Sequence, residues 1–284
     1  MEAVTTAAGL RRILAEWRQA GLRTALVPTM GALHEGHLAL VDQAKQLAGR
    51  VVATIFVNPL QFGPEEDLTR YPRDLERDQG LLGGRGVDVV YAPAVAEMYP
   101  APPLVTIDPG PMAGVLEGAV RPGHFAGVLT VLAKLFHLVG PDVACFGQKD
   151  IQQAVLVRRM VADLDWPIEV VVVPTVRDAD GLALSSRNRL LSPPERQQAL
   201  VLSRMLRTVE SAWLAGVRGG TALLEVGREV LARVPAVRID YAVIVDPAQL
   251  DALDAVVPGS IAAFAARVGT TRLIDNVTLA ERGS

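Results

Sequence analysis

The chain has 284 residues, half of them hydrophobic, and a formal net charge of −3 at pH 7. This length allows a substantial core and is comfortable for two domains. The small negative charge gives no reason to expect a protein that binds nucleic acid or a membrane surface. No uncharged apolar stretch approaches the ~20 residues of a membrane span, and the N-terminus lacks the pattern of a signal peptide.

The only cysteine, Cys145, has no second cysteine with which to form an internal disulfide, which predicts a reducing, cytoplasmic setting. Its neighbours, Val143-Ala144-Cys145-Phe146-Gly147, are typical of the end of a buried strand. Free cysteine packs as a small hydrophobe, so we interpret Cys145 as an inert core thiol rather than a nucleophile.

Strand-like and helix-like segments alternate over the first part of the chain. The strand-like runs are short, apolar and rich in β-branched residues, and they cover 24–28, 50–57, 87–93, 141–146 and 168–174. Helical patterns cover 10–20, 38–48, 74–82 and 125–139. The alternation predicts a parallel sheet covered by helices, whose ligands bind beyond the carboxyl ends of the strands.

The pattern changes near Val176. Ser192-Pro193-Pro194-Glu195 is a good helix start, with Ser as N-cap, Pro in the first turn and Glu at the third position. Helices are predicted at 193–215 and 221–233, and strands at 239–246 and 260–268. We therefore expect one domain over residues 1–176 and a smaller α/β domain over 177–284.

The first candidate site is Met30-Gly31-Ala32-Leu33-His34-Glu35-Gly36-His37, which follows a predicted strand and opens a helix. Unpaired N–H groups and a partial positive charge make a helix start suitable for phosphate. Three-residue spacing places His34 and His37 on one face, where two imidazoles can stabilise charge during adenylyl transfer. Two surface histidines or a metal pair are the alternatives, but no Cys, Asp or third His stands nearby in sequence to complete a metal site.

The second candidate site is Phe146-Gly147-Gln148-Lys149-Asp150, at the carboxyl end of another predicted strand. Lys149 is one of three lysines, and its compact ammonium suits phosphate oxygens. Asp150 either accepts from a ribose hydroxyl or caps the next helix. Gln153, one turn further, would face the same cleft.

Three further polar loops could complete the site. Leu184-Ser185-Ser186-Arg187-Asn188 either clamps a triphosphate or is only a polar loop. The amide of Asn58, in Phe56 to Gly63, suits a substrate that carries hydroxyls and a carboxylate. Arg121-Pro122-Gly123-His124-Phe125 either binds an anion or shapes its loop.

Taken together and in this order, these motifs closely resemble the pantothenate synthetase (pantoate–β-alanine ligase) family. The resemblance runs from about Thr24 to Gly269-Thr270-Thr271-Arg272-Leu273-Ile274-Asp275-Asn276. It implies a Rossmann-like parallel sheet with helices on both faces, a smaller C-terminal α/β lid domain, a homodimer, and ATP with Mg²⁺. Position 184 is Leu where some members resemble Met-Ser-Ser-Arg, an exchange that preserves an apolar contact.

The resemblance also implies residue roles. ATP would contact three segments, which comprise Met30, Gly31, Ala32, Leu33, His34, Glu35, Gly36 and His37; Gly147, Gln148, Lys149 and Asp150; and Val176, Leu184, Ser185, Ser186 and Arg187. Gln61 and Gln153 would bind pantoate, with Asn58 in the same substrate motif. His34, His37, Lys149 and Arg187 would share the charge of the transition state, and His37 would either donate a proton or only hydrogen-bond phosphate.

The expected reaction joins pantoate to β-alanine through a pantoyl adenylate and releases pyrophosphate and AMP. Two alternatives remain at this stage. An adenylyltransferase of the same superfamily would leave AMP on its product, and a nucleotide-sensing protein would bind ATP without turnover. Asp74 and Asp78 could reach a magnesium ion, or the phosphates could hold it alone.

Overall fold

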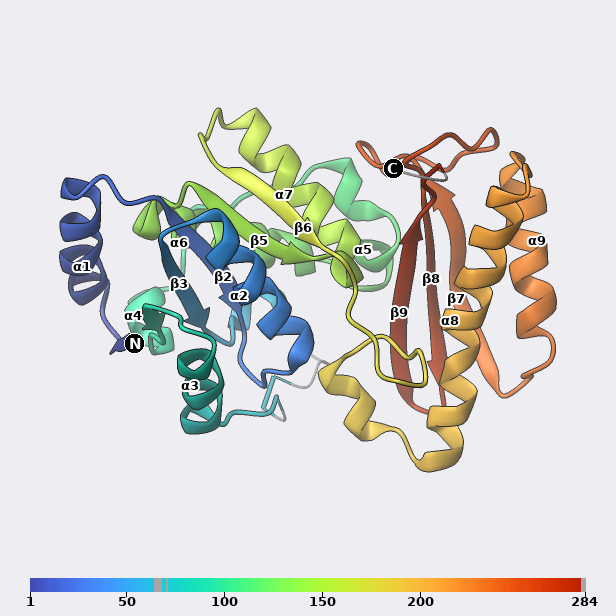
Figure 1. Cartoon of the computed structure of the whole chain (residues 1–284), viewed down its shortest axis with the longest axis horizontal. Helices are drawn as coiled ribbons and strands as arrows, with labels where there is room; N and C mark the ends of the chain where they lie inside the picture. Colours follow the sequence, from blue (N-terminus) through green and yellow to red (C-terminus); the bar gives the residue numbers. More distant parts are fainter. Residues whose placement is uncertain (64–67, 70, 282–284) are drawn as a thin grey trace. The chain divides into compact units, whose positions relative to one another are not determined.

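The computed structural model describes residues 1–63, 68–69 and 71–281, and the chain divides into two compact units (Figure 1). The first unit comprises Met1–Gly147 and Gln152–Pro174, and the second comprises Gln148–Ile151 and Thr175–Ser284. The second unit thus begins at Thr175 rather than at residue 177. It also includes Gln148–Ile151, which sequence analysis assigned to the first domain.

The first unit is built on a six-stranded sheet in which every neighbouring pair of strands is parallel. The strand order is β1-β4-β3-β2-β5-β6, with bounds β1 Glu2–Val4, β2 Thr24–Thr29, β3 Arg50–Ile55, β4 Val89–Tyr91, β5 Val143–Gly147 and β6 Glu169–Val173. The predicted parallel sheet is confirmed. The edge strand β1 was not predicted, because three residues show no periodicity that could identify a strand.

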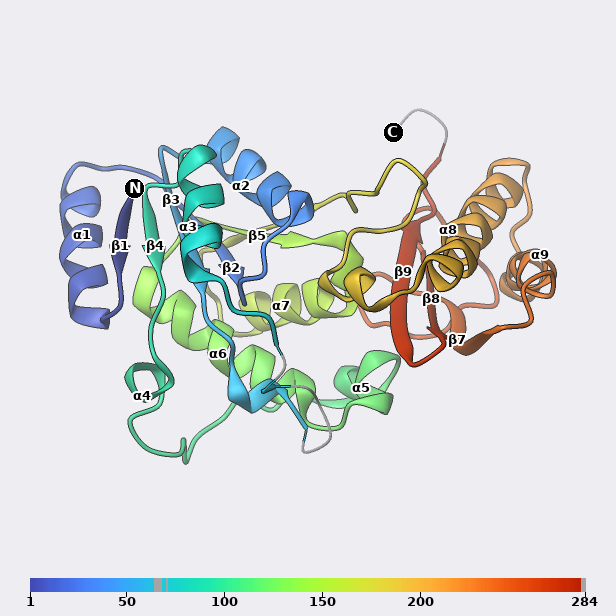
Figure 2. The same ribbon diagram turned by 90° about the horizontal axis from the view of Figure 1, so that it is seen from below.

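Helices cover both faces of this sheet, as expected. The longer ones are α1 Ala7–Gln19, α2 Glu35–Leu47, α3 Leu75–Gly84, α6 His124–Val139 and α7 Ile151–Asp163. Short elements between them are η1 Pro59–Gln61, α4 Val95–Met98, η2 Pro111–Gly114, α5 Glu117–Val120 and η3 Gln148–Asp150. In Figure 2, α2 and α3 lie on one face of the sheet and α6 and α7 on the other. Right-handed crossovers between parallel strands produce this arrangement.

The strand order reverses direction at β2. From β2 the chain adds β3 and then β4 on one side, and it later returns to place β5 on the other side of β2. The loops that leave β2 and β5 therefore diverge, and a doubly wound sheet binds its ligands at such a switch point. Buried side chains of β2, β3, β5 and α2 form a core beneath the first of these loops.

The second unit packs two helices against a three-stranded antiparallel sheet of order β7-β8-β9. Its elements are η4 Ser186–Leu190, α8 Pro193–Leu214, α9 Gly220–Leu231, β7 Val237–Val245, β8 Ile261–Val268 and β9 Thr271–Thr278. Trp213 of α8 and Phe264 of β8 are almost fully buried in its core. Ser192 and Glu195 form the predicted capping box at the start of α8. Strand β9 was not predicted; a two-residue turn with Gly269 at φ 56° joins it to β8.

Over the described residues, the structure contains no helix that combines the length and apolar character required to cross a bilayer.

In the first unit, the close approach of α6 to η1 depends on one glycine. A Cβ atom at Gly127 would lie 2.1 Å from the carbonyl oxygen of Leu60 and 2.7 Å from the main-chain nitrogen of Gln61. These are backbone atoms, so a larger residue cannot be accommodated by rotation of a side chain.

We expect Gly127→Ala to lower the free energy of unfolding by at least about 2 kcal/mol, because α6 must move away from η1. Gly80→Ala is the matched control, since Gly80 also lies inside a helix but has no atom within 4 Å of the added Cβ. That control should be neutral or stabilising, as Ala is the better helix former. Urea denaturation measures both variants, and equal stabilities would contradict the packing argument.

Candidate functional site

The turn that follows β2 is fixed by two threonines at the carboxyl ends of neighbouring strands. Thr29 donates through Oγ1 to the carbonyl oxygen of Thr54 at 2.6 Å, and its own N–H donates to Thr54 Oγ1 at 3.3 Å. The N–H of Gly31 then donates to Thr29 Oγ1 at 3.1 Å. The candidate phosphate loop therefore starts from a rigid, buried position.

Asp78 on α3 holds the middle of this loop. Its carboxylate accepts hydrogen bonds from the N–H groups of Ala32 at 2.7 Å and Leu33 at 2.9 Å, and its side chain is 1% exposed. Gly31 and Ala32 both have positive φ, 80° and 53°. In this turn, the N–H groups of Ala32 and Leu33 converge as a nest that binds an anion, and here the anion is the Asp78 carboxylate.

Sequence analysis considered Asp74 and Asp78 for a magnesium ion, but the structure gives both carboxylates local roles. Asp74 caps α3 by accepting from the N–H of Arg77 at 3.1 Å. Asp78 is buried within the loop that it holds, and Arg77 donates to it at 3.3 Å. Within the described part of the chain, no cluster of three or more His, Cys, Asp or Glu side chains is placed to hold a metal ion.

His34 and His37 form a reciprocal cap at the start of α2. The Nδ1 atom of His34 accepts from the N–H of Gly36 at 3.1 Å, and the Nδ1 atom of His37 accepts from the N–H of His34 at 3.3 Å. The two rings lie 4.2 Å apart between centroids, as expected for one helix face. Because each Nδ1 accepts, the neutral rings carry their protons on Nε2, so each imidazole is a donor at that atom.

The hydrogen bonds within this loop show that the main-chain N–H groups predicted as phosphate donors are mostly used inside the protein. The N–H groups of Gly31, Ala32, Leu33, His34 and Gly36 all donate within the protein. Sequence analysis expected unpaired main-chain N–H groups at this helix start. The structure instead uses them to fix the loop, which leaves the imidazole Nε2–H groups and the helix dipole as the features suited to an anion.

Gln61 is held at the end of the loop after β3. Its side chain is 8% exposed, its Oε1 accepts from Asn58 Nδ2 at 3.2 Å, and its Nε2 lies 2.9 Å from Met30 Sδ. Met30 and Gln61, both predicted site residues, are therefore in contact. They extend from neighbouring strands β2 and β3 at the carboxyl edge of the sheet.

Asn58 hydrogen-bonds extensively within the protein. Its Nδ2 donates to Gln61 and to the carbonyl oxygen of Gly127, and its Oδ1 accepts from Leu60 N–H and from the hydroxyl of Tyr99 at 3.0 Å. Burial raises the pKa of Tyr99 to about 12, so this hydroxyl stays protonated. Asn58 is 1% exposed and both N–H groups of its amide are used inside the protein, so these contacts position Gln61.

Arg121 and His124 support the backbone of Gln61, as the loop-shaping interpretation of their motif expects. The His124 Nδ1 lies 2.8 Å from the Gln61 carbonyl oxygen, and the His124 Nε2 lies 2.9 Å from Arg121 Nη1. Arginine can only donate, so His124 accepts at Nε2 and donates from Nδ1. The motif shapes the loop that carries Gln61.

Two adjacent glutamines at the start of α7 differ in environment. Gln153, the predicted substrate contact, is half-buried. Gln152 is 3% exposed, accepts from the N–H of Glu117, and donates to the carbonyl oxygens of Met112 and Val115. Sequence analysis missed Gln152. Its polar type within an otherwise apolar helix face was the available signal.

The remaining predicted ATP contacts, apart from Gly147 at the end of β5, belong to the second unit. Val176 and Leu184 lie opposite each other in a small hairpin, where Leu184 N–H donates to the Val176 carbonyl oxygen at 2.9 Å. The turn of this hairpin is tied to α8 by Arg196, which donates to Asp178 and Asp180. These partners give the hairpin a defined structure.

The Ser-Ser-Arg motif follows this hairpin directly. Ser185 caps η4 by accepting from the N–H of Arg187 at 3.3 Å, Ser186 opens η4, and the Arg187 side chain is exposed. Lys149 lies in η3 of the same unit with 16% of its side chain exposed, and its Nζ is 3.5 Å from Asp150 Oδ1. Each segment thus presents one cation beside polar groups.

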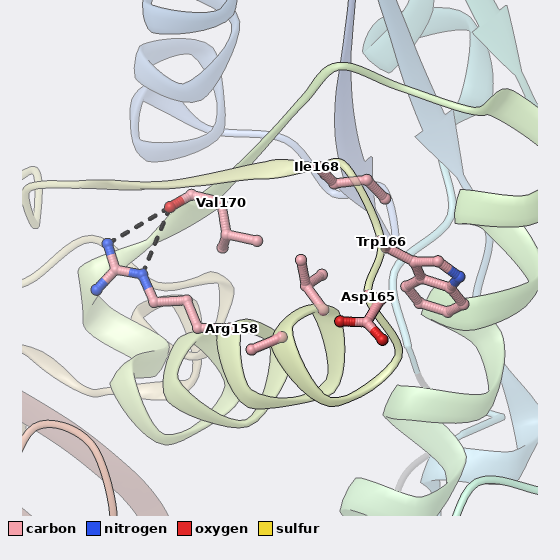
Figure 3. A pocket seen from close by; sticks show the side chains of 7 residues that line it. Arg158, Asp165, Trp166, Ile168 and Val170 are labelled. Carbon is pink, nitrogen blue, oxygen red and sulfur yellow. Dashed lines mark hydrogen bonds between the residues drawn. The ribbon is translucent and has the colours of Figure 1, made fainter.

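Two cavities among the described residues contain none of the predicted site residues. The cavity in Figure 3 has a volume of about 430 Å³ and is lined by residues of α7, β6 and the turn between them, including Arg158 and Trp166. Arg158 donates there to the carbonyl oxygen of Val170 near the start of β6. The second, of about 500 Å³, lies around Trp17, Arg50 and Asp88. The loops that carry the predicted site residues lie instead at the carboxyl ends of strands, so the candidate site is defined by the side chains of these loops and not by either cavity.

Comparison with known proteins adds the family. The family model described as pantoate-beta-alanine ligase matches residues 2–278. A pantothenate synthetase of Acidobacterium capsulatum is 58% identical over 255 residues, which make up 90% of this chain and 85% of that protein. The crystal structure of pantothenate synthetase from Thermus thermophilus is 50% identical, with a TM-score of 0.91 over 99% of this chain and 100% of that one. A pantoate-beta-alanine ligase of Francisella tularensis, solved with beta-gamma ATP and beta-alanine, is 31% identical, with a TM-score of 0.80 over 98% of both chains.

A doubly wound sheet with a switch point, and paired histidines at a helix start beyond it, are typical of a nucleotide-binding α/β protein. The match over nearly the whole chain shows more: the protein belongs to the pantoate–β-alanine ligase family. It is an ATP-dependent ligase that forms pantothenate.

We expect Asp78→Asn to lower the free energy of unfolding by about 1–3 kcal/mol, because one buried N–H of the loop loses its acceptor. Asp74→Asn is the control. It makes the same chemical change at the start of the same helix but outside the nest, and Asn is an equally good N-cap, so stability should change little. Thermal unfolding followed by circular dichroism compares them. Equal effects would show that the nest does not depend on the Asp78 carboxylate.

Burial, with a smaller contribution from the charge of Glu169, raises the pKa of Cys145 to about 11, and this supports the interpretation as an inert core thiol. At pH 8 about 0.1% of such a thiol is ionised, against about a tenth or more in the unfolded chain. Alkylation by iodoacetamide should therefore be at least about 100-fold slower in the folded protein than in denaturant. Mass spectrometry measures the rates, and fast labelling of the folded chain would contradict a core position.

Proposed function

We propose that the chain condenses pantoate with β-alanine in two steps, through an enzyme-bound pantoyl adenylate. The observation that carries this proposal is the pairing of two elements in the first unit. One is the start of α2, where His34 and His37 present Nε2–H donors, and the other is Gln61, fixed by its contacts with Met30 and Asn58. Phosphate donors and a buried amide at the carboxyl edge of the same sheet suit adenylation of a hydroxy acid.

In the first step, a carboxylate oxygen of pantoate attacks the α-phosphorus of ATP, a P–O bond forms, and pyrophosphate leaves. In the second step, the neutral amine of β-alanine attacks the adenylate carbonyl, the C–N bond forms, a proton leaves the nitrogen, and AMP departs. Neither step needs an enzyme nucleophile. Catalysis then depends on positioning and on charge stabilisation.

We assign the charge stabilisation to His34, His37, Lys149 and Arg187. A neutral imidazole that accepts at Nδ1 stabilises phosphate by donating from Nε2, and this hydrogen bond does not require proton transfer. Gln61 and Gln153 are assigned to pantoate. ATP is assigned to four segments of the chain, which are Met30 to His37, Gly147 to Asp150, Val176, and Leu184 to Arg187.

Mg²⁺, a homodimer and a cytoplasmic location complete the proposal. Phosphate oxygens are ligands that Mg²⁺ prefers, so the triphosphate itself can carry the ion to the site. When bound, the ion would neutralise part of the phosphate charge. The complex of the Francisella tularensis relative with beta-gamma ATP and beta-alanine supports ATP and β-alanine as substrates here.

The proposal predicts pantoate-dependent exchange of labelled pyrophosphate into ATP in the absence of β-alanine, because the first step is reversible on its own. Addition of β-alanine should then release AMP and pantothenate in equal amounts. No exchange would exclude a separate adenylation step. A product that retains AMP would instead support the alternative, an adenylyltransferase of the same superfamily.

A further inference from the structure

Two consecutive residues of β9 contact both of the ATP-binding segments that lie in the second unit. We propose that Asp275 and Asn276 are positioning residues that hold Gln148–Asp150 and Val176–Arg187 in one fixed arrangement. The inference rests on the proposed function, because it concerns how that function's ATP contacts are placed. All of these residues belong to the same compact unit.

Asn276 holds the segment that carries Lys149. Its Nδ2 donates to the carbonyl oxygens of Gln148 at 2.9 Å and Lys149 at 3.0 Å, so both N–H bonds of the amide are used. Gln148 Nε2 adds a hydrogen bond to Thr278 Oγ1, two residues further along β9. The backbone of Lys149 is therefore fixed to a strand, while the side chain keeps its own rotamers.

The burial of Asn276 argues for more than a structural role. The residue is 3% exposed, and its Oδ1 has no hydrogen-bond partner among the described residues. A buried acceptor without a partner destabilises a fold, so a residue selected for stability alone would avoid it. The amide supplies two donors that match two adjacent carbonyl oxygens, which no apolar side chain could satisfy.

Asp275 holds the other segment. Arg177 donates to it twice, from Nη1 at 2.6 Å and from Nη2 at 2.9 Å, and Asp275 is 3% exposed. The same Nη1 donates to the carbonyl oxygen of Gly181 at 3.3 Å. A bidentate pair of this kind fixes both distance and orientation. The hairpin that brings Val176 and Leu184 together is thereby tied to β9.

The two contacts are themselves connected. The N–H of Asn276 donates to Asp275 Oδ1 at 2.9 Å, so one short stretch of backbone lies between the anchor of Lys149 and the anchor of the hairpin. Successive side chains of a strand point to opposite sides, which allows one strand to hold two segments. Disturbing either anchor should therefore change how ATP is held and used, with little effect on how pantoate is bound.

The test is a double-mutant cycle with the full-length enzyme, read out as AMP formation from labelled ATP so that slow variants remain measurable. Asn276→Ala should reduce kcat/KM for ATP by about tenfold or more and leave KM for pantoate within about twofold. Lys149→Ala should cause a larger loss. If Asn276 acts through Lys149, the double variant should lose no more than about twofold beyond Lys149→Ala.

Independent losses that multiply in the double variant would overturn the proposal for Asn276, because a purely structural residue costs the same factor in both backgrounds. Should Asn276→Ala fail to fold, Asp275→Asn tests the other anchor, with an expected rise of about tenfold in KM for ATP. A change confined to KM for pantoate would contradict it.

Asp240→Asn is the matched control for Asp275→Asn. Asp240 of β7 accepts from Arg272 at 2.6 Å and pairs with Arg267 at 3.4 Å in the same sheet, so the same chemical change weakens ion pairs between strands of this sheet. Its KM for ATP should stay within about twofold of the parent value, and an equal rise in both variants would overturn the proposal. Absence of pyrophosphate exchange in the parent enzyme would instead refute the proposed function.

Discussion

The carboxylate of Asp78 lies against the N–H groups of Ala32 and Leu33, and the direction in which α2 leaves the sheet depends on this contact. Ala32 has a left-handed backbone conformation, which costs about 1–3 kcal/mol for a residue with a side chain. A buried anion offsets that cost by filling the nest. The turn then places His34 at the N-cap and His37 three residues later, so their rings share one face.

A common design appears around the other predicted site residues. Many of the polar groups in the motifs hydrogen-bond to one another. Asn58 and His124 fix the side chain and the backbone of Gln61, and Gly127 allows a helix to approach the same loop. In the second unit, Asp275 and Asn276 do the same for the hairpin and for Lys149. The proposed reaction needs no enzyme nucleophile and would gain its rate from fixed geometry, and a large supporting network fits that chemistry.

Much of the fold followed from local patterns. Five of the strands in the parallel sheet are apolar, β-branched runs, and such runs are recognisable because a strand buried on both faces excludes polar residues. The start of α8 was predicted from Ser192 and Glu195, since a capping box is a contact between residues three apart. Strand β1 is too short to show a period. Strand β9 was missed because its composition alone does not identify it as a strand. Its pairing with β8, across the glycine turn that joins the two strands, defines it instead.

The sequence by itself determined the family, the parallel sheet and the buried position of Cys145, because these depend on residue type and on short spacings. Only the tertiary structure decided which polar atoms are used. It showed that Asp78, distant along the chain, occupies N–H groups expected to bind phosphate, and that the amide of Asn58 serves Gln61. Hydrogen bonds between distant residues leave no periodic signal in a sequence. Whether a donor or acceptor is already used can therefore be decided only when the residue that pairs with it has been located in the structure.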